Sequence, residues 1–332
     1  MTEKTKFSWG AATGVGSLPG GDAREAAKTV TGSFEDFPHL FELPARGPGA
    51  DMIGRTLGLL VEMYAHVEPS GWRISDRPGR DTRRGRSFLR EDLDALEEFT
   101  QGYRGPLKIQ AVGPWTLAAA LELRTGESVL RDPGACRDLA ESLTEGIRTH
   151  LAEVRRRIPG ADVVLQLDEP SLTAVLRGRV RTASGYHTHR AVDRQLVEAA
   201  LREVIGDETA VVHSCAPDVP VALLRRAGAA AVSLDFDLLT ERDDDAVGEA
   251  VEGGLTLFAG VVPSTDTGLS DPAGSVMGVR ALWRRLGLDP GTLSRSVVIT
   301  PTCGLAGASP GYARAALDHC VRAARSLAEH PE

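Results

Sequence analysis

The 332-residue sequence contains no uninterrupted apolar run of 18 residues, and its first ten residues, MTEKTKFSWG, lack the apolar core of a signal peptide. We therefore expect neither a membrane span nor export. Cysteine is also scarce, with four in the whole chain. In a chain with no export signal, so few cysteines are typical of the reducing cytoplasm and argue against a disulfide framework. The sequence thus predicts a cytoplasmic protein.

Positive charge is in deficit as well, because 46 acidic residues outnumber 38 lysines and arginines and give a formal net charge of −8. This balance argues against a surface for nucleic acid or for anionic membranes. A chain of this length buries about three quarters of its unfolded surface and needs no covalent staples. The length fits two average domains or one α/β barrel.

Eight short β-rich segments alternate with amphipathic helical segments along the chain. Several of the β segments are almost continuously apolar, as expected for parallel strands that are covered on both faces. Eight β–α repeats are typical of an α/β fold of the TIM, or (β/α)8, barrel type, which we expect to form a single domain over residues 1–332. The predicted strands are 11–17, 39–44, 107–113, 162–170, 209–215, 230–236, 255–262 and 296–304.

A doubly wound parallel sheet is the alternative fold. It is weakened by the absence of a G-x-G-x-x-G turn, since the glycines of GAATGVG near residue 11 do not open a helix in the required register. The longest connection, 68–88, is rich in arginine, glycine and proline. We expect it to be a solvated loop, with a lid over the active site as the alternative.

Polar residues gather where the predicted strands end. In a TIM barrel the carboxyl ends of the strands carry the active site, so these residues are expected to face one another. They are Gly16 and Ser17 at the end of the first strand, Glu42 at the end of the second, Trp115 at the third, Asp168 and Glu169 at the fourth, His213 and Cys215 at the fifth, Asp235 and Asp237 at the sixth, and Cys303 at the eighth.

His213 and Cys215 are separated by two residues, so on a strand both side chains point to the same face. Taken alone, the pair is more typical of a buried histidine and an inert thiol. The additional strand-end residues Cys303 and Asp235 change this interpretation, because two sulfurs, an imidazole and a carboxylate suit a four-coordinate zinc site. Asp237 shares the face of Asp235 and is the alternative carboxylate ligand.

His187 and His189, in the polar segment GYHTHR, form a rival histidine pair. No thiol or carboxylate stands at a matching spacing, so we interpret the segment as a solvent-facing loop.

Asp168 ends a strand whose other residues are mostly apolar, VVLQLD. A buried carboxylate is costly unless it has a partner, which favours a functional role for this residue. We expect Asp168 and the adjacent Glu169 to be catalytic. A sulfur-rich zinc site can bind a substrate thiol and lower its pKa, which favours alkyl transfer to sulfur.

Five short sequences occur in an order that resembles a known family: GVGSLPG, GPWTL, QLDEPSL, HSC and TPTCGL. Along nearly its whole length the chain is similar to the catalytic carboxyl-terminal barrel of cobalamin-independent methionine synthases. The resemblance implies a zinc-dependent methyltransferase that methylates homocysteine to methionine. In that family the zinc ligands are a histidine, two cysteines and a carboxylate, which correspond to His213, Cys215, Cys303 and Asp235, although glutamate is the usual carboxylate.

The resemblance also implies a substrate site for homocysteine. The segment that binds the amino acid corresponds to Gly16 and Ser17, and two further acids correspond to Glu42 and Asp168. Trp115 could offer an aromatic face to a ligand.

Two departures concern the methyl donor. The family's pterin-stacking tryptophan falls near Ala120, and its proton-donating histidine falls in GVVPSTD, which has no histidine. The chain therefore resembles the short, single-barrel members, and a folate, methylcobalamin and a corrinoid protein all remain candidate donors. The alternative functions are another zinc-dependent thiol alkyltransferase of the epoxide-opening type, a non-catalytic thiol- or corrinoid-binding homologue, and a uroporphyrinogen-decarboxylase-like enzyme.

Overall fold

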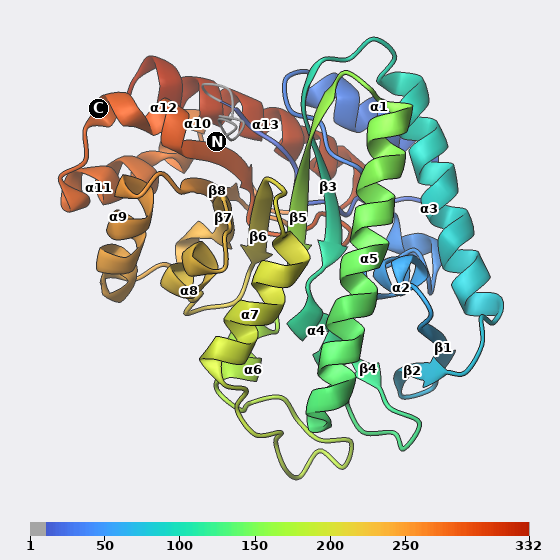
Figure 1. Ribbon diagram of the computed structural model, residues 1–332. Helices are drawn as coiled ribbons and strands as arrows, with labels where there is room; N and C mark the ends of the chain where they lie inside the picture. Colours follow the sequence, from blue (N-terminus) through green and yellow to red (C-terminus); the bar gives the residue numbers. More distant parts are fainter. Residues whose placement is uncertain (1–10, 332) are drawn as a thin grey trace.

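A curled sheet of six parallel strands forms the centre of the molecule in the computed structural model, which describes residues 11–331 (Figure 1). The protein therefore has an α/β fold with a half-barrel that fits a TIM-like barrel. Neighbouring strands follow one another in chain order. They are β3 (Gly105–Val112), β5 (Ala161–Asp168), β6 (Ala210–Ser214), β7 (Ala231–Asp235), β8 (Thr256–Val262) and β9 (Val297–Pro301).

Helices cover the outer face of this sheet, and most of the longer ones begin at an aspartate or serine whose side chain accepts a backbone N–H of the first turn. No helix within residues 11–331 has both the length and the apolar character needed to cross a membrane. The helices are α1 (Ala23–Ser33), α2 (Met52–Leu59), α3 (Arg80–Phe99), α4 (Pro114–Ala120), α5 (Pro133–Arg157), α6 (Leu172–Leu176), α7 (Arg194–Ile205), α8 (Val221–Arg226), α9 (Asp244–Glu252), α10 (Pro272–Ser275), α11 (Met277–Leu286), α12 (Leu293–Ser296) and α13 (Pro310–Glu329).

The first two predicted strands, 11–17 and 39–44, do not form regular ladders. Instead, isolated bridges join Ala12 to Ile299 of β9, Ser17 to Glu42, and His39 to Lys108 of β3. Glycines allow other side chains to come close to the first segment. A Cβ atom on Gly14, for example, would lie 2.2 Å from the His39 ring. The two segments therefore lie between β9 and β3 in the order that a barrel requires, but they are held by single bridges.

A small apolar cluster lies apart from the main core between sheet and helices. It takes one residue from each of five strands, one from segment 11–17 and one from just before segment 39–44, and most of the strand residues stand near the starts of their strands. We call it the interior apolar layer. Its members are Ala11, Phe37, Val164, Val211, Ala231, Phe258 and Val298.

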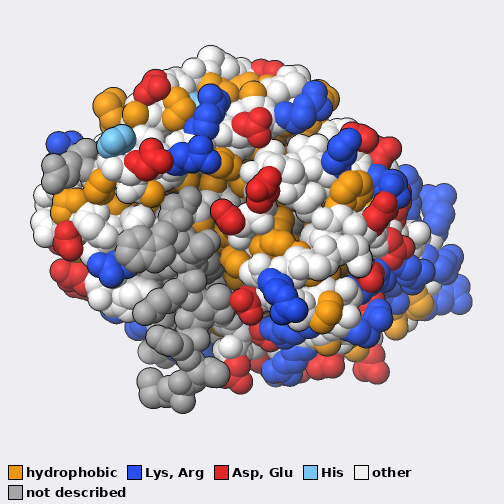
Figure 2. All heavy atoms as spheres, turned by 90° about the horizontal axis from the view of Figure 1, so that it is seen from above, with side chains coloured by type: hydrophobic (Ala, Val, Ile, Leu, Met, Phe, Trp, Pro, Cys, Tyr) orange, Lys and Arg blue, Asp and Glu red, His pale blue; other side chains and the backbone are white. Residues whose placement is uncertain are grey.

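Most of residues 68–88 are exposed or half-buried, as predicted, but they form regular elements and not a loop. The chain there forms an antiparallel hairpin of β1 (Tyr64–Glu68) and β2 (Gly71–Ser75), and β2 also pairs with the short β4 (Leu121–Glu122). Helix α3 then begins at Arg80. Thr82, Gly85 and Leu89 form a buried stripe on this helix, and the many arginines obscure that stripe in the sequence. Figure 2 shows Lys and Arg side chains gathered along the edge of the molecule where Figure 1 draws α3.

Substitution of two helical glycines tests how closely α5 packs against α2. A Cβ atom on Gly146 in α5 would lie 2.4 Å from the Leu59 carbonyl oxygen, where α5 packs against α2. We expect Gly146→Ala to lower the free energy of unfolding by about 1–3 kcal/mol, because the two helices must move apart. The matched control is Gly32→Ala in α1, where a Cβ atom meets nothing within 4 Å.

Chemical denaturation measures both variants. Gly32→Ala should be neutral or stabilising by up to about 1 kcal/mol, because alanine has the higher helix propensity. Equal stabilities for the two variants would contradict close packing of α5 on α2.

Candidate metal centre and substrate site

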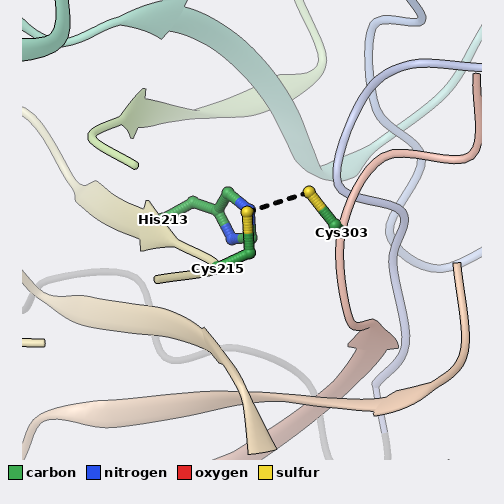
Figure 3. Close-up of side chains that lie close together, drawn as sticks. All are labelled: His213, Cys215 and Cys303. Atoms are coloured by element: carbon green, nitrogen blue, oxygen red, sulfur yellow. Dashed lines mark hydrogen bonds between the residues drawn. The ribbon is translucent and has the colours of Figure 1, made fainter. Parts of the chain in front are cut away.

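Backbone pairing places residues at the ends of three adjacent strands next to one another. Asp168 at the end of β5 pairs with His213 of β6, and His213 pairs with Ser233 of β7. Because the strands are parallel, their carboxyl ends lie at the same edge of the sheet. Cys303, which follows β9 along the chain, returns to this edge and faces Cys215 (Figure 3).

His213, Cys215 and Cys303 form a group that could hold a metal ion. One ligand atom from each lies within 4.8 Å of the other two, and the two Sγ atoms are 3.0 Å apart. The His213 Nδ1 atom hydrogen-bonds the Ser233 hydroxyl at 2.9 Å, while its Nε2 atom is buried and has no hydrogen-bond partner among the described residues. Because Nδ1 is occupied by the hydrogen bond to Ser233, Nε2 is available as a metal ligand.

The donor set fits zinc in chemistry and nearly in spacing. Thiolates on one tetrahedral zinc ion are about 3.8 Å apart, given Zn–S bonds of about 2.3 Å, so the sulfurs need to separate by less than about 1 Å. Their hydrogen bond lowers the pKa of Cys303 and raises that of Cys215. The pair therefore gives up one proton readily and holds the second, which a divalent cation would displace.

Neither predicted carboxylate ligand belongs to this group of three. Asp235 ends β7 and accepts the Asp237 backbone N–H at 3.1 Å, at the start of a short 3-10 turn, Phe236–Leu238. Burial raises the pKa of Asp235, which also interacts electrostatically with Cys303 and His213. The Asp237 side chain is exposed. A fourth ligand from Asp235 stays a prediction.

Two buried carboxylates, Glu42 and Asp168, line the interior beside the thiols. The Asp168 Oδ1 atom accepts the Gln166 amide at 2.7 Å, and the Glu42 Oε1 atom lies 4.0 Å from the Arg55 Nε atom. Burial raises the pKa of Glu42 to about 7, against the lowering effect of Arg55. Burial likewise raises the pKa of Asp168 to about 6, although His213 and Lys108 lower it. The two acids also interact with each other.

The structure brings Gly16 and Ser17 to the same place. The Leu18 N–H donates to the Glu42 carbonyl at 2.9 Å, and the Glu42 N–H donates to the Gly16 carbonyl at 3.1 Å. A Cβ atom on Gly304 would lie 2.1 Å from the Ser17 hydroxyl, so this hydroxyl stands against the residue that follows Cys303. The predicted amino-acid site and the thiols are therefore neighbours.

Glu169 and Trp115 lie elsewhere. Strand alternation turns Glu169 away from the side of Asp168, and its oxygens accept the Trp115 N–H at 2.9 Å, the Thr116 N–H at 2.8 Å and the Thr116 hydroxyl at 2.7 Å. Trp115 is 5% exposed, and its indole donates to the Val197 carbonyl of α7. These contacts hold helix α4 in place. The catalytic role of Glu169 and the ligand contact of Trp115 stay predictions, and these contacts give both residues a structural role.

The rival pair His187 and His189 does not form a metal group with other described residues. His187 is exposed, as expected for a solvent-facing loop. His189 is buried, which corrects that expectation for this residue, and its Nε2 atom lies 4.0 Å from Glu127.

Residue-pattern reasoning missed three polar side chains that support the site: Lys108, Gln166 and Ser233. Each stands inside an apolar strand, in LKIQAV, VVLQLD and AVSLD, and each is buried. A polar residue within an apolar run was the signal available in the sequence, since a buried polar group requires a partner.

The sequence matches the family described as the cobalamin-independent synthase catalytic domain over residues 10–326. Among solved structures, it is similar to a B12-independent methionine synthase from Shewanella sp. W3-18-1 in complex with selenomethionine, with a TM-score of 0.64, 13% identity, and coverage of 96% of this chain and 97% of that one. A methyltransferase from Methanosarcina mazei gives a TM-score of 0.57, 16% identity, and coverage of 99% and 95%. No curated protein matches the chain.

Proposed function

The chain belongs to the family of cobalamin-independent synthase catalytic domains, and on this basis we propose that it is a zinc-dependent methyltransferase that converts homocysteine to methionine. The observation that carries the proposal is the meeting of His213, Cys215 and Cys303 beside two buried carboxylates. A thiol-containing amino acid needs a metal site to bind its sulfur and acidic side chains to accept its ammonium group. We further propose that segments 11–17 and 39–44 complete a single-domain (β/α)8 barrel.

His213, Cys215 and Cys303 would hold the zinc ion, with Asp235 as the fourth ligand. A zinc ion in this thiolate-rich shell supplies a lowered pKa for the substrate thiol, so that sulfur is available as a nucleophile at neutral pH. Ser233 keeps the His213 ring oriented through Nδ1. The Gln166 amide donates a hydrogen bond to Asp168 and so fixes the orientation of this carboxylate.

Glu42 and Asp168 would accept the ammonium group of homocysteine, and Gly16 and Ser17 would donate to its carboxylate. Burial of both acids supports this assignment, because little water competes for the ammonium. The Shewanella structure contains selenomethionine, an amino acid with the shape of the expected product. In this proposal Asp168 orients the substrate.

In the transfer, the substrate sulfur forms a bond to the methyl carbon, and the donor keeps the electron pair of the bond that breaks. The two donor-contact residues that the family resemblance implies are absent from their corresponding positions. Ala120 is an exposed residue at the end of α4, and residues 260–266 contain no histidine. A folate, methylcobalamin and a corrinoid protein therefore all stay candidates.

Metal content tests the ligand assignment. Purified wild-type protein should contain about one zinc ion per chain, and Cys215→Ser combined with Cys303→Ser should abolish binding because both thiolates are lost. Cys136→Ser is the control, since Cys136 lies on α5 and belongs to no metal group among the described residues. Metal-free wild-type protein, or a double variant that retains zinc, would sink the assignment.

The pH dependence of substrate binding tests Glu42. Its pKa of about 7 means that the carboxylate is mostly neutral below that pH and ionised above it. An ammonium group prefers the ionised form, so Glu42→Gln should weaken homocysteine binding by about tenfold near pH 8 and by much less near pH 6. Calorimetry on zinc-loaded protein gives both dissociation constants.

Comparing the variant with the wild type removes the contribution of thiol ionisation, which is common to the two proteins. A ratio of dissociation constants that stays the same between about pH 6 and pH 8 would count against Glu42 as the ammonium acceptor.

A panel of methyl donors tests the reaction itself. Zinc-loaded protein is incubated with homocysteine and with methylcobalamin, methyl-folate or S-methylmethionine, and methionine is measured. We expect methionine with at least one donor. If none yields methionine while zinc and homocysteine still bind, the non-catalytic thiol-binding alternative is favoured. Alkylation of a thiol by an epoxide, added in place of the methyl donor, would favour the epoxide-opening alkyltransferase.

A further inference from the structure

One charged residue lies at the level of the interior apolar layer. Val164 of that layer pairs in register with Lys108 on β3, and β3 is the strand of the six that contributes no residue to the layer. Lys108 is fully buried. Its stem thus stands where the other strands place alanine, valine or phenylalanine. An apolar residue would complete this layer at lower cost, so packing does not account for the lysine.

The Lys108 ammonium takes part in a chain of hydrogen bonds that reaches the substrate site. Its Nζ atom donates to the Val15 carbonyl at 2.9 Å, and the same carbonyl accepts the Gln166 Nε2 atom at 2.9 Å. Gln166 Nε2 also donates to Asp168 Oδ1 at 2.7 Å. Val15 immediately precedes Gly16 and Ser17, so two buried donors hold the backbone of this segment next to Asp168.

We propose that Lys108 is a positioning residue: through the Val15 carbonyl it fixes the Gly16–Ser17 segment against Asp168, and so shapes the amino-acid half of the pocket before a substrate binds. The inference rests on the proposed function, in which that segment and Asp168 bind homocysteine. The charged groups that act on Lys108 are Asp168 and Glu42, and His39 is affected by it in turn. Within residues 11–331 Lys108 forms no ion pair with an acid, and its Nζ atom donates to the Val15 carbonyl instead.

This arrangement predicts a separation of stability from binding. Burial lowers the pKa of Lys108 to about 7. Burying an amine in this way is costly to the fold, whereas a pre-organised backbone favours ligand binding. Lys108→Met keeps an unbranched side chain that is one atom shorter, and it removes the amine. The Val15 carbonyl retains Gln166 as a donor in this variant, so the carbonyl is not left without a partner.

The test compares Lys108→Met with wild type and with Lys28→Met, an exposed control on α1, all as full-length zinc-loaded protein. Three measurements are made: the thermal unfolding midpoint, hydrogen exchange of the amides of residues 13–18, and the dissociation constants of homocysteine and 2-mercaptoethanol. The second thiol lacks both the ammonium and the carboxylate, so it reports binding through sulfur alone.

We expect Lys108→Met to exchange faster over 13–18 without a lower midpoint, and to bind homocysteine at least about tenfold more weakly, while 2-mercaptoethanol binding is unchanged. Unchanged exchange together with unchanged homocysteine binding would overturn the proposal. So would a lower midpoint with equal losses for both thiols, because that pattern indicates a merely structural role.

The two proposals fail in different ways. If wild-type protein binds zinc but not homocysteine, the proposed function falls, and faster exchange over 13–18 in Lys108→Met would still support the positioning role. If wild type binds homocysteine and Lys108→Met binds it equally well, the function stands and the role of Lys108 falls.

Discussion

Parallel strand direction is the constraint on which the rest of the site depends. Because β5, β6 and β7 run the same way and pair in register, Asp168, His213 and Ser233 come side by side without any loop having to place them. The same direction returns the chain after β9 to that edge and sets Cys303 against Cys215. His213 is therefore held within the sheet ladder, and Cys215 and Cys303 stand one and two residues beyond the ends of β6 and β9, which gives a rigid frame for metal ligands.

The interior of the sheet has two chemically different levels. The interior apolar layer fills the part near the strand starts, and polar side chains occupy the part toward the strand ends. Such burial of polar groups costs free energy unless each has a partner. Several buried atoms here have none among the described residues, including both ring nitrogens of His39 and Nε2 of His213. A site that binds ligands is where such incomplete pairing is expected.

A second set of buried charges supports Glu42 from outside the sheet. Arg55 lies near Glu42 and also pairs with Asp92 of α3, which in turn pairs with Arg46. Asp92 is fully buried, and breaking such a network by removing one partner is strongly destabilising. The helix hidden in the arginine-rich segment 80–99 thereby contributes to the substrate side of the site.

The amino-acid sequence by itself determined the parts that depend on local pattern. Near-continuous apolar runs identified the parallel strands, and the i, i+2 spacing of His213 and Cys215 placed both on one face. The long helices at α5 and α13 followed from their apolar period. The arginine-rich stretch was misread because a narrow buried stripe of Thr82, Gly85 and Leu89 is weak against its charge.

Only the tertiary structure decided which strand-end residues meet. Asp168 and Glu169 are adjacent in sequence, yet Asp168 faces the interior of the sheet and Glu169 contacts the start of α4. Alternate residues of a strand point to opposite faces. Trp115 is likewise directed to α7 by helix packing. The role of Lys108 depends on a carbonyl 93 positions away in the chain. Contacts of that kind arise when distant segments fold together, and no local spacing records them.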